Sequence, residues 1–352
     1  MPEPRHASPD AKAPARRTRL CAALAAVAVA AAAVAGIALW EASRSQADVG
    51  DALQAAAAPE AGEAADVEDV DDAAPEEPAV AHVTGTTASG ISYEGSSAIE
   101  GSDALAELED VVALYQGRGL TLSIAMYDLE SDAWLTYQPD SRVYSASAIK
   151  GPYCIFLCSQ LVDAGRVGAS IMPTVQNCIQ NSDNDAYRTI RSSTMNMGWS
   201  GWLEGAGVPM EEGRAYRFDN RWYADMCASD LVACWRAAYD YLSSGEGQSA
   251  TLASYFERTV HSPLHDVLGG GLRVWSKAGW YSGAEEEGAS AATNDAGIVF
   301  ADSGTYVVAV MSNAPADFEP LEQAVDAVNR CHGALTGGSE ASLLAATDDA
   351  AA

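Results

Sequence analysis

Residues 20–40 form the longest apolar stretch of the chain and contain no charged residue. A stretch of about 20 apolar residues suffices to cross a bilayer as a helix. Three arginines lie immediately before it, and basic residues beside a span stay on the cytoplasmic side. The pattern therefore predicts a cytoplasmic N-terminus at 1–19, a single membrane anchor at 20–40, and the rest of the chain outside the cytoplasm. A cleaved signal sequence is the alternative, although its apolar core is usually shorter, about 7–15 residues.

The next segment, residues 41–100, contains few of the large apolar residues that a core needs. Alanine, proline and acidic residues dominate it, and Arg44 is its only lysine or arginine. Such a composition is typical of disordered segments. It predicts a disordered acidic linker at 41–100, and the similar composition of 336–352 predicts a disordered tail.

Residues 101–335 show the periodic apolar patterns of regular secondary structure. These patterns predict helices at 102–116, 147–164, 171–180, 184–193, 229–243 and 320–331, and strands at 120–127, 133–137, 273–276, 297–301 and 306–312. Two strands near the start and three near the end enclose a block of helices. This order predicts an α+β domain in which one antiparallel sheet, flanked by helices, receives strands from both ends of the domain and carries an inserted helical lobe.

The formal net charge of −29 argues against a nucleic acid partner, because phosphate binding needs a basic surface. No CxxC pair occurs, and the helical spacing of His261 and His265 is interrupted by Pro263 without an evident third metal ligand. Neither a metal nor another cofactor is expected.

The cysteines at 154 and 158 lie on one predicted helix and are expected to be small buried residues. Outside the cytoplasm one of them could pair with Cys178, but the spacing does not fix a connectivity.

Candidate chemistry begins with Ser147-Ala-Ile-Lys150, an S-x-x-K motif. Residues three apart share a helix face, so Lys150 is expected beside the Ser147 hydroxyl. A serine hydroxyl becomes an effective nucleophile when a neighbouring base removes its proton. Alone, the motif is explained as well by a capping serine and a solvated lysine.

Two further motifs follow in order. Residues 182–184 read Ser-Asp-Asn, and residues 277–279 read Lys-Ala-Gly at the end of a predicted strand, similar to K-T-G. A helix start and a turn glycine are their simple structural explanations. All three motifs in this order, each in a suitable local setting, form a much more specific signal.

On these motifs, residues 102–335 resemble the penicillin-recognising serine hydrolases, which include the class A β-lactamases and the penicillin-binding proteins. The resemblance implies that Ser147 is the acylated nucleophile and that Lys150 accepts its proton, directly or through water. Ser182 would pass a proton to the leaving nitrogen. Asn184 would bind the substrate amide and hold Lys150.

The resemblance also assigns roles to the last motif. Lys277 would supply positive charge near the substrate carboxylate, and Ala278 and Gly279 would line the substrate-binding strand. The backbone N–H groups of Ser147 and Trp280 would form the oxyanion hole.

The chain departs from the family in two places. The Glu-x-x-Leu-Asn stretch, whose glutamate activates the deacylating water in class A β-lactamases, is missing from residues 207–226. The carboxylates there, Glu211, Glu212, Asp219 and Asp225, are expected to be solvated loop charges. Asp219 is the strongest candidate among them for a base that activates the deacylating water. Ala278 also lacks the hydroxyl that would help to hold a substrate carboxylate.

These features predict an extracytoplasmic, membrane-anchored serine hydrolase. It would form an acyl-enzyme with a β-lactam or a D-Ala-D-Ala-like peptidoglycan peptide, and act as a slow β-lactamase or a carboxypeptidase. The alternative is a non-catalytic cell-envelope module that keeps the fold for binding. No pattern in the sequence indicates an oligomeric state.

Overall fold

The computed structural model describes residues 81–211, 213–283 and 290–337. Within these ranges, no helix is both long enough and apolar enough to cross a bilayer. The predicted span at 20–40 lies outside them, as do the basic N-terminus and nearly all of the predicted C-terminal tail.

Eight strands of the described residues form one sheet, in the order β1-β2-β4-β3-β10-β9-β7 with β8 also paired to β9. All of the pairings are antiparallel. The strands are β1 (His82–Thr86), β2 (Ser92–Ser96), β3 (Leu122–Asp128), β4 (Trp134–Tyr137), β7 (Arg273–Ser276), β8 (Gly279–Tyr281), β9 (Ala292–Ala301) and β10 (Gly304–Ser312). The central pair, β3 and β10, joins the two ends of the domain, as the sequence predicted.

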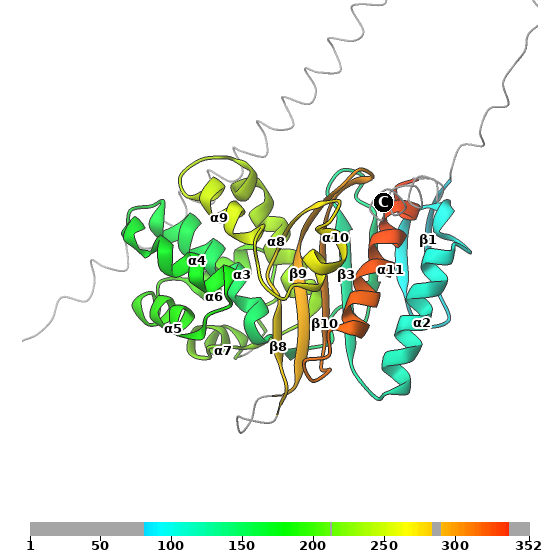
Figure 1. The fold of residues 1–352 in the computed structure, drawn as a ribbon, viewed down its shortest axis with the longest axis horizontal. Helices are drawn as coiled ribbons and strands as arrows, with labels where there is room; N and C mark the ends of the chain where they lie inside the picture. The colour runs from blue at the N-terminus through cyan, green and yellow to red at the C-terminus, as the bar shows by residue number, and fades with distance from the viewer. Residues whose placement is uncertain (1–80, 212, 284–289, 338–352) are drawn as a thin grey trace, which may run out of the picture. The chain divides into compact units, whose positions relative to one another are not determined.

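Helices cover both faces of this sheet (Figure 1). On one face lie α2 (Asp103–Gly117), α10 (Pro263–Leu268) and α11 (Glu319–Leu335). On the other face, α8 (Ala228–Ser243) packs against β3, β9 and β10 and supports the helical lobe, residues 146–256. The rest of the lobe comprises η2 (Ala146–Ile149), α3 (Lys150–Phe156), the π-helical η3 (Leu157–Val162), η4 (Ala169–Ile171), α4 (Met172–Gln180), α5 (Asn184–Ser193), α6 (Trp199–Gly205), α7 (Arg214–Asn220) and α9 (Ser249–Phe256).

The central strands are apolar on both sides because each face of the sheet meets a hydrophobic core. In β10, Val308 and Val310 join the core beneath α2 and α11, whereas Val307, Ala309 and Met311 join the core beneath the helical lobe. The sheet thus fixes the lobe on the opposite side from the terminal helices.

The sequence located the longer elements but missed the shorter ones. Helix α2 begins where predicted, with the Ser102 hydroxyl accepting a hydrogen bond from Leu105 N at 3.2 Å. The strand β8 and the helices α6, α7, α9 and α10, none longer than eight residues, were not predicted. Such short segments hold too few residues for a period to be recognised. The α+β architecture itself is confirmed.

The predicted disordered linker at 41–100 is wrong for its last part. Strands β1 and β2 occupy it, and β2 pairs with β4 through Tyr93 and Leu135. Ile91 and Tyr93 are buried in the core, and buried and partly buried residues alternate over 91–96 as in a strand. The glycine and serine residues of this segment concealed that alternation in the sequence. Gly95 is required there, since its φ is +156° and an added Cβ would lie 2.7 Å from the Leu335 carbonyl oxygen.

Cys154, Cys158 and Cys178 are free thiols with 0% exposure, which confirms that they are small buried residues. The sulfur atoms of Cys154 and Cys178 lie 3.9 Å apart without a covalent bond. They fill space between α3 and α4.

A buried hydrogen bond between side chains links the end of β3 to α11. His332 Nε2 lies 2.8 Å from Asp128 Oδ2, and neither side chain is more than 1% exposed. Burial alone would raise the pKa of Asp128, but hydrogen bonds from His332 and Ser131 outweigh it and lower the pKa to about 2.

This pair predicts acid sensitivity. Because the folded pKa of about 2 lies below the ordinary value of 3.8, the carboxylate contributes stability above pH ~4, and that stability is lost as the pH falls towards 2. We expect Asp128→Asn to lower the free energy of unfolding at pH 7 by about 2 kcal/mol and to flatten the loss between pH 4 and 2. Urea unfolding at several pH values measures both. The exposed substitution Asp240→Asn on α8 should do neither, and an equal effect of the two would contradict this interpretation.

Candidate active site

The first motif lies where the sheet meets the helical lobe. Ser147 lies on the 3₁₀ turn η2 rather than inside a long helix, and Lys150 follows at the start of α3. Residues three apart in a 3₁₀ turn are eclipsed, which places positions 147 and 150 on one face of the turn. Ser147 is partly exposed and thus open to a ligand, whereas Lys150 is completely buried.

Two features distinguish the backbone of this turn. Ala146 has a φ of +44°, an uncommon conformation for a residue with a side chain. Asn294 of β9 donates from Nδ2 to the carbonyl oxygens of Tyr144 and Ser145, at 2.9 and 3.0 Å. The nucleophile is therefore anchored to a central strand of the sheet.

The second motif supplies acceptors to Lys150. Lys150 Nζ donates to the Ser182 carbonyl oxygen at 2.6 Å and to Asn184 Oδ1 at 2.8 Å. A neutral lysine amine has two N–H bonds and one lone pair, so these acceptors can use both N–H bonds and leave the lone pair to take a proton. Asp183 caps α5 by accepting from Ala186 N at 2.6 Å, which fits a structural role.

The third motif reaches the same serine from the other side. Lys277 Nζ donates to Ser182 Oγ at 3.0 Å and to the Ala278 carbonyl oxygen at 2.6 Å. Both Lys277 and Ala278 are completely buried. Ser182 therefore contacts Lys150 through its backbone and Lys277 through its hydroxyl.

Gly279 brings strand β8 against the nucleophile. A Cβ added at this position would lie 2.2 Å from Ala148 N and 2.5 Å from Ser147 N, and no side chain fits so close to backbone. The strand can therefore pass beside the Ser147 N–H, the first predicted oxyanion donor. Trp280, which carries the second predicted donor, is the next residue of the same strand.

A family model described as the β-lactamase enzyme family matches residues 167–331. Three solved structures share the fold. They are a mutant of PBP-A in an acyl-enzyme complex with penicillin G (20% identity, TM-score 0.50, 64% of this chain and 95% of that chain), the extended-spectrum β-lactamase TLA-1 (13%, 0.52, 67% and 100%), and a β-lactamase from Sphaerobacter thermophilus (19%, 0.50, 66% and 97%).

The resemblance to the penicillin-recognising serine hydrolases is confirmed. Identities this low establish the fold alone, so the chemistry of this chain depends on its own side chains. A search of curated proteins finds no match.

Burial lowers the pKa of both lysines of the candidate active site. It lowers the pKa of Lys150 to about 8. Burial and the neighbouring charge of Lys150 together lower the pKa of Lys277 to about 7. Near neutral pH, each lysine can therefore exchange a proton, and Lys277 is only partly charged.

Tyr223 is a neighbour of this site that the sequence analysis missed. Its hydroxyl donates to Asn184 Oδ1 at 2.9 Å, beside the bond from Lys150. The rings of Tyr187 and Tyr223 lie 5.6 and 5.9 Å from Lys150 Nζ. Tyr144 meets Tyr223 edge-on, at 6.1 Å between ring centroids. Nothing in the sequence marks these tyrosines as distinct from core aromatics.

Asp295 of β9, which was also not predicted, supports the strand end that precedes Lys277. Its Oδ2 accepts from the Ser262 hydroxyl at 2.6 Å and from Leu264 N at 3.0 Å, and Ser262 bonds Ser276 at 2.7 Å. Burial raises the pKa of Asp295 to about 6. This buried network fixes the end of β7 immediately before Lys277.

The carboxylates of residues 207–226 are engaged elsewhere. Asp219, the strongest sequence candidate for a deacylating base, accepts from Ser200 N at 3.1 Å and Ser200 Oγ at 2.8 Å. Glu211 pairs with Arg142 and Arg214, Asp225 is exposed on β6 (Asp225–Met226), and Glu212 lies outside the described residues. None of the three described carboxylates has a hydrogen bond to a motif residue.

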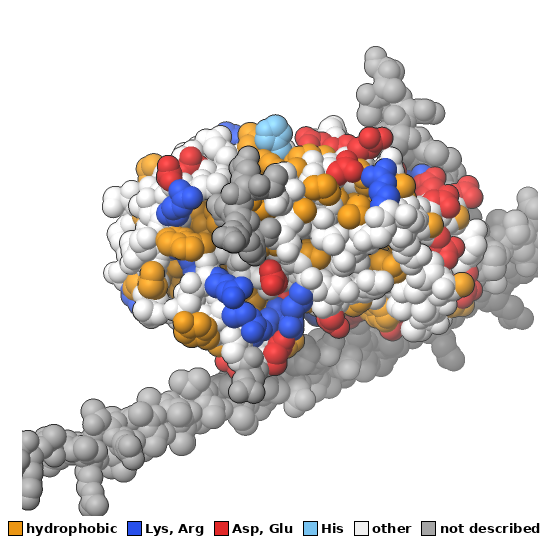
Figure 2. All heavy atoms as spheres, turned by 90° about the horizontal axis from the view of Figure 1, so that it is seen from below, with side chains coloured by type: hydrophobic (Ala, Val, Ile, Leu, Met, Phe, Trp, Pro, Cys, Tyr) orange, Lys and Arg blue, Asp and Glu red, His pale blue; other side chains and the backbone are white. Residues whose placement is uncertain are grey.

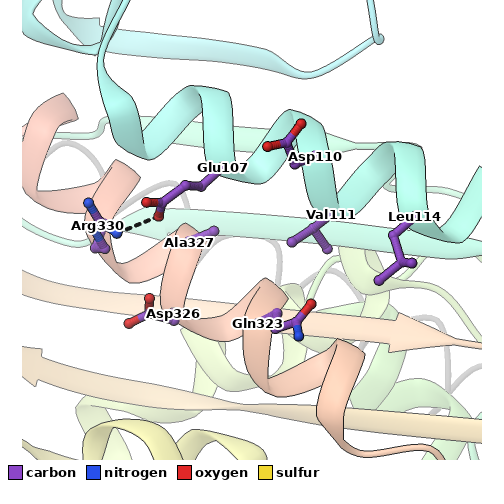
Figure 3. Close-up of a pocket in the computed structure, with 8 residues that line it drawn as sticks. All are labelled: Glu107, Asp110, Val111, Leu114, Gln323, Asp326, Ala327 and Arg330. Carbon is purple, nitrogen blue, oxygen red and sulfur yellow. Dashed lines mark hydrogen bonds and ion pairs between the residues drawn. The ribbon is translucent and has the colours of Figure 1, made fainter.

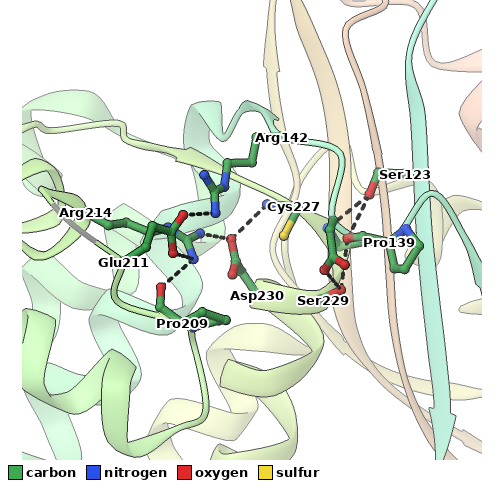
Figure 4. A network of polar contacts seen from close by, with 11 residues as sticks. Ser123, Pro139, Arg142, Pro209, Glu211, Arg214, Cys227, Ser229 and Asp230 are labelled. Carbon is green, nitrogen blue, oxygen red and sulfur yellow. Dashed lines mark hydrogen bonds and ion pairs between the residues drawn. The ribbon is translucent and has the colours of Figure 1, made fainter.

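Figure 4 shows the polar contacts that hold the segment before α8, residues 209–227, in place. The buried Arg214 pairs with Asp230 and donates to the Pro209 carbonyl oxygen at 2.7 Å, while Asp230 accepts from Cys227 N at 3.0 Å. Tyr223 lies inside this segment. Its contact with Asn184 is therefore supported from both ends.

A separate cavity of about 380 Å³ lies between α2 and α11 (Figure 3). Glu107 and Arg330 pair across it, and no motif residue lines it. It belongs to the other face of the sheet and is not part of the candidate active site.

The lysine pKa values predict a pH profile for acylation. Because a base must be neutral to accept a proton, the acylation rate should rise as the pH passes about 8 and level off above it. Lys150→Arg keeps a positive charge that cannot be removed and should slow acylation about 10²–10⁴-fold. Stopped-flow acylation by penicillin at pH 6–10 measures this, with the exposed Arg236→Lys as a control. A flat profile would exclude Lys150 as the base.

Proposed function

We propose that this domain is a serine hydrolase that forms an acyl-enzyme on Ser147 with a β-lactam or a D-Ala-D-Ala-like peptide. The observation that carries the proposal is the meeting of two buried lysines at Ser182, one of which, Lys150, directly follows the turn of the partly exposed Ser147. Lysines are seldom fully buried, and lowered lysine pKa values are typical of catalytic groups.

In the proposed reaction, Lys150 accepts the Ser147 proton as Oγ attacks the acyl carbon. The new O–C bond forms as the C–N bond of the substrate breaks. Since Lys277 already donates to Ser182 Oγ, the Ser182 hydroxyl hydrogen is available for the leaving nitrogen, and a proton from Lys277 then replaces it on Ser182. The N–H groups of Ser147 and Trp280 would stabilise the oxyanion, each worth about 10²–10³ in rate.

For the second half of the reaction, hydrolysis of the acyl-enzyme, no base is evident among the residues that the structure describes. The described carboxylates of residues 207–226 are held by Ser200, by Arg142 and Arg214, or exposed on β6, and a tyrosine occupies the contact with Asn184. These observations support a long-lived acyl-enzyme. The alternative, a binding module that keeps the fold without catalysis, is favoured by the missing hydroxyl at Ala278.

Incubation with benzylpenicillin separates these candidates. We expect intact-mass spectrometry to show one covalent adduct, located by peptide mapping on Ser147 and absent from Ser147→Ala. Ser145→Ala, within two residues of the nucleophile, is a matched control that should retain the adduct. Penicillin that binds without any covalent adduct would favour the binding module.

The lifetime of the adduct tests the missing base. Because a positioned base is worth about 10²–10⁴ in rate, the adduct should remain long after excess drug is removed, in contrast to a class A β-lactamase run in parallel. Loss of the adduct at the rate of that enzyme would show that another group activates water.

We also propose that residues 20–40 anchor the protein with this domain outside the cytoplasm. The support is the uncharged apolar run and the three arginines before it. Protease added to intact spheroplasts should release the domain, while a cytoplasmic marker stays intact. Protection of the domain, with a known outer protein cleaved, would reverse the topology.

A further inference from the structure

The side of the candidate active site next to Lys277 carries three aromatic rings. Trp280 meets His261 at 5.6 Å and Phe318 at 5.5 Å between ring centroids, both edge-on. The Lys277 Nζ lies 6.0 Å from the Trp280 ring centroid. We call these three rings, from His261, Trp280 and Phe318, the aromatic subsite.

Strand geometry places the aromatic subsite apart from the tyrosines. Successive side chains of a strand point to opposite faces. Position 279 faces the Ser147 turn, and the Tyr281 ring meets Tyr144 at 5.9 Å. Trp280, between them in sequence, therefore points to the opposite face, where it meets the residues that precede α10 and α11.

These rings are accessible, unlike the aromatic residues of the core. Trp280 and Phe318 are partly exposed and His261 is exposed, whereas Trp235 and Phe256 have no exposed surface. An exposed group of rings at the strand that carries the second predicted oxyanion donor offers apolar contact to a ligand.

Lys277 and Ala278, the two residues that the resemblance places at a substrate carboxylate, are poorly suited to bind one here. Lys277 is completely buried, and its ammonium already donates to Ser182 Oγ and to the Ala278 carbonyl oxygen. Ala278 has no hydroxyl and no exposed surface. The net charge of −29 adds long-range repulsion of anions. Lys277 links the aromatic subsite to the Ser182 hydroxyl, which would protonate the leaving atom, because its Nζ lies 3.0 Å from Ser182 Oγ and 6.0 Å from the Trp280 ring centroid.

We propose that the aromatic subsite binds an uncharged aromatic group on the leaving-group side of the substrate. This inference rests on the proposed acylation of Ser147. The Ser147 oxygen bonds to the acyl carbon, the bond from that carbon to the leaving oxygen or nitrogen breaks, and the leaving group departs as the protonated alcohol or amine. The substrates favoured would thus be aryl esters or amides without a carboxylate at that end.

The test compares two esters that share an acyl group. N-acetyl-D-alanine phenyl ester and its 3-carboxyphenyl counterpart differ in charge, while their leaving phenols are similar. We expect the wild-type protein to be acylated by the phenyl ester about 10-fold faster. Phenol release and the adduct mass on Ser147 are measured together, with Ser147→Ala as the blank.

Variants assign any preference to the rings. Trp280→Leu keeps apolar bulk and the backbone N–H but removes the ring, and it should reduce the ratio of the two rates to within about 3-fold. Phe318→Leu should reduce it partly. Trp134→Ala, a partly exposed tryptophan on β4, should leave the ratio unchanged. Thermal unfolding of each variant shows that the fold persists.

The outcomes separate the two proposals. Faster acylation by the carboxyphenyl ester, equal rates in the wild type, or an unchanged ratio in both leucine variants overturns this inference. So does acylation by penicillin when neither ester reacts, since Ser147 is then active without the preference. If penicillin and both esters all fail to acylate Ser147, the proposed function falls and the inference falls with it.

Discussion

Two lysine side chains without exposed surface approach a single serine residue, and the arrangement of the site depends on how their charge is accommodated. Removing an ammonium group from water is costly unless it is paired or gives up its proton. Among the described residues, no carboxylate pairs directly with either nitrogen; Ser182, Asn184 and Ala278 supply oxygen acceptors instead. The site therefore favours loss of a proton, which a proton-accepting base requires.

Such an arrangement requires three segments that are distant in the sequence to keep fixed positions relative to one another. Asn294 anchors the nucleophile turn to β9, and Gly279 lets β8 pass within backbone contact of it. Asp295 holds the strand end before Lys277 through Ser262 and Ser276. Each of these supports comes from the sheet, which positions both the Ser147 turn of the helical lobe and the strand end before Lys277.

The sequence revealed the reactive groups because their chemistry restricts which residue types can serve. A serine, a lysine three residues later, and two short motifs downstream were enough to assign Ser147, Lys150, Ser182 and Lys277 to one place. Tyr223 and Asp295 were missed because a tyrosine or an aspartate becomes informative only when its neighbours across the fold are known. Strand β2 was missed for a different reason, since its glycine and serine residues outweighed the buried Ile91 and Tyr93 in composition.

Strand β8 passes so close to the Ser147 backbone that position 279 tolerates no side chain, whereas positions 280 and 281 can accept substitutions. Any side chain at 279 would collide with the backbone beside Ser147, so natural variation and laboratory selection should both retain glycine there. Positions 280 and 281 point to opposite faces and carry large, partly exposed rings. Ligand preference can therefore diverge on either side of the strand by single substitutions while the nucleophile keeps its geometry, which makes these two positions natural starting points for directed evolution.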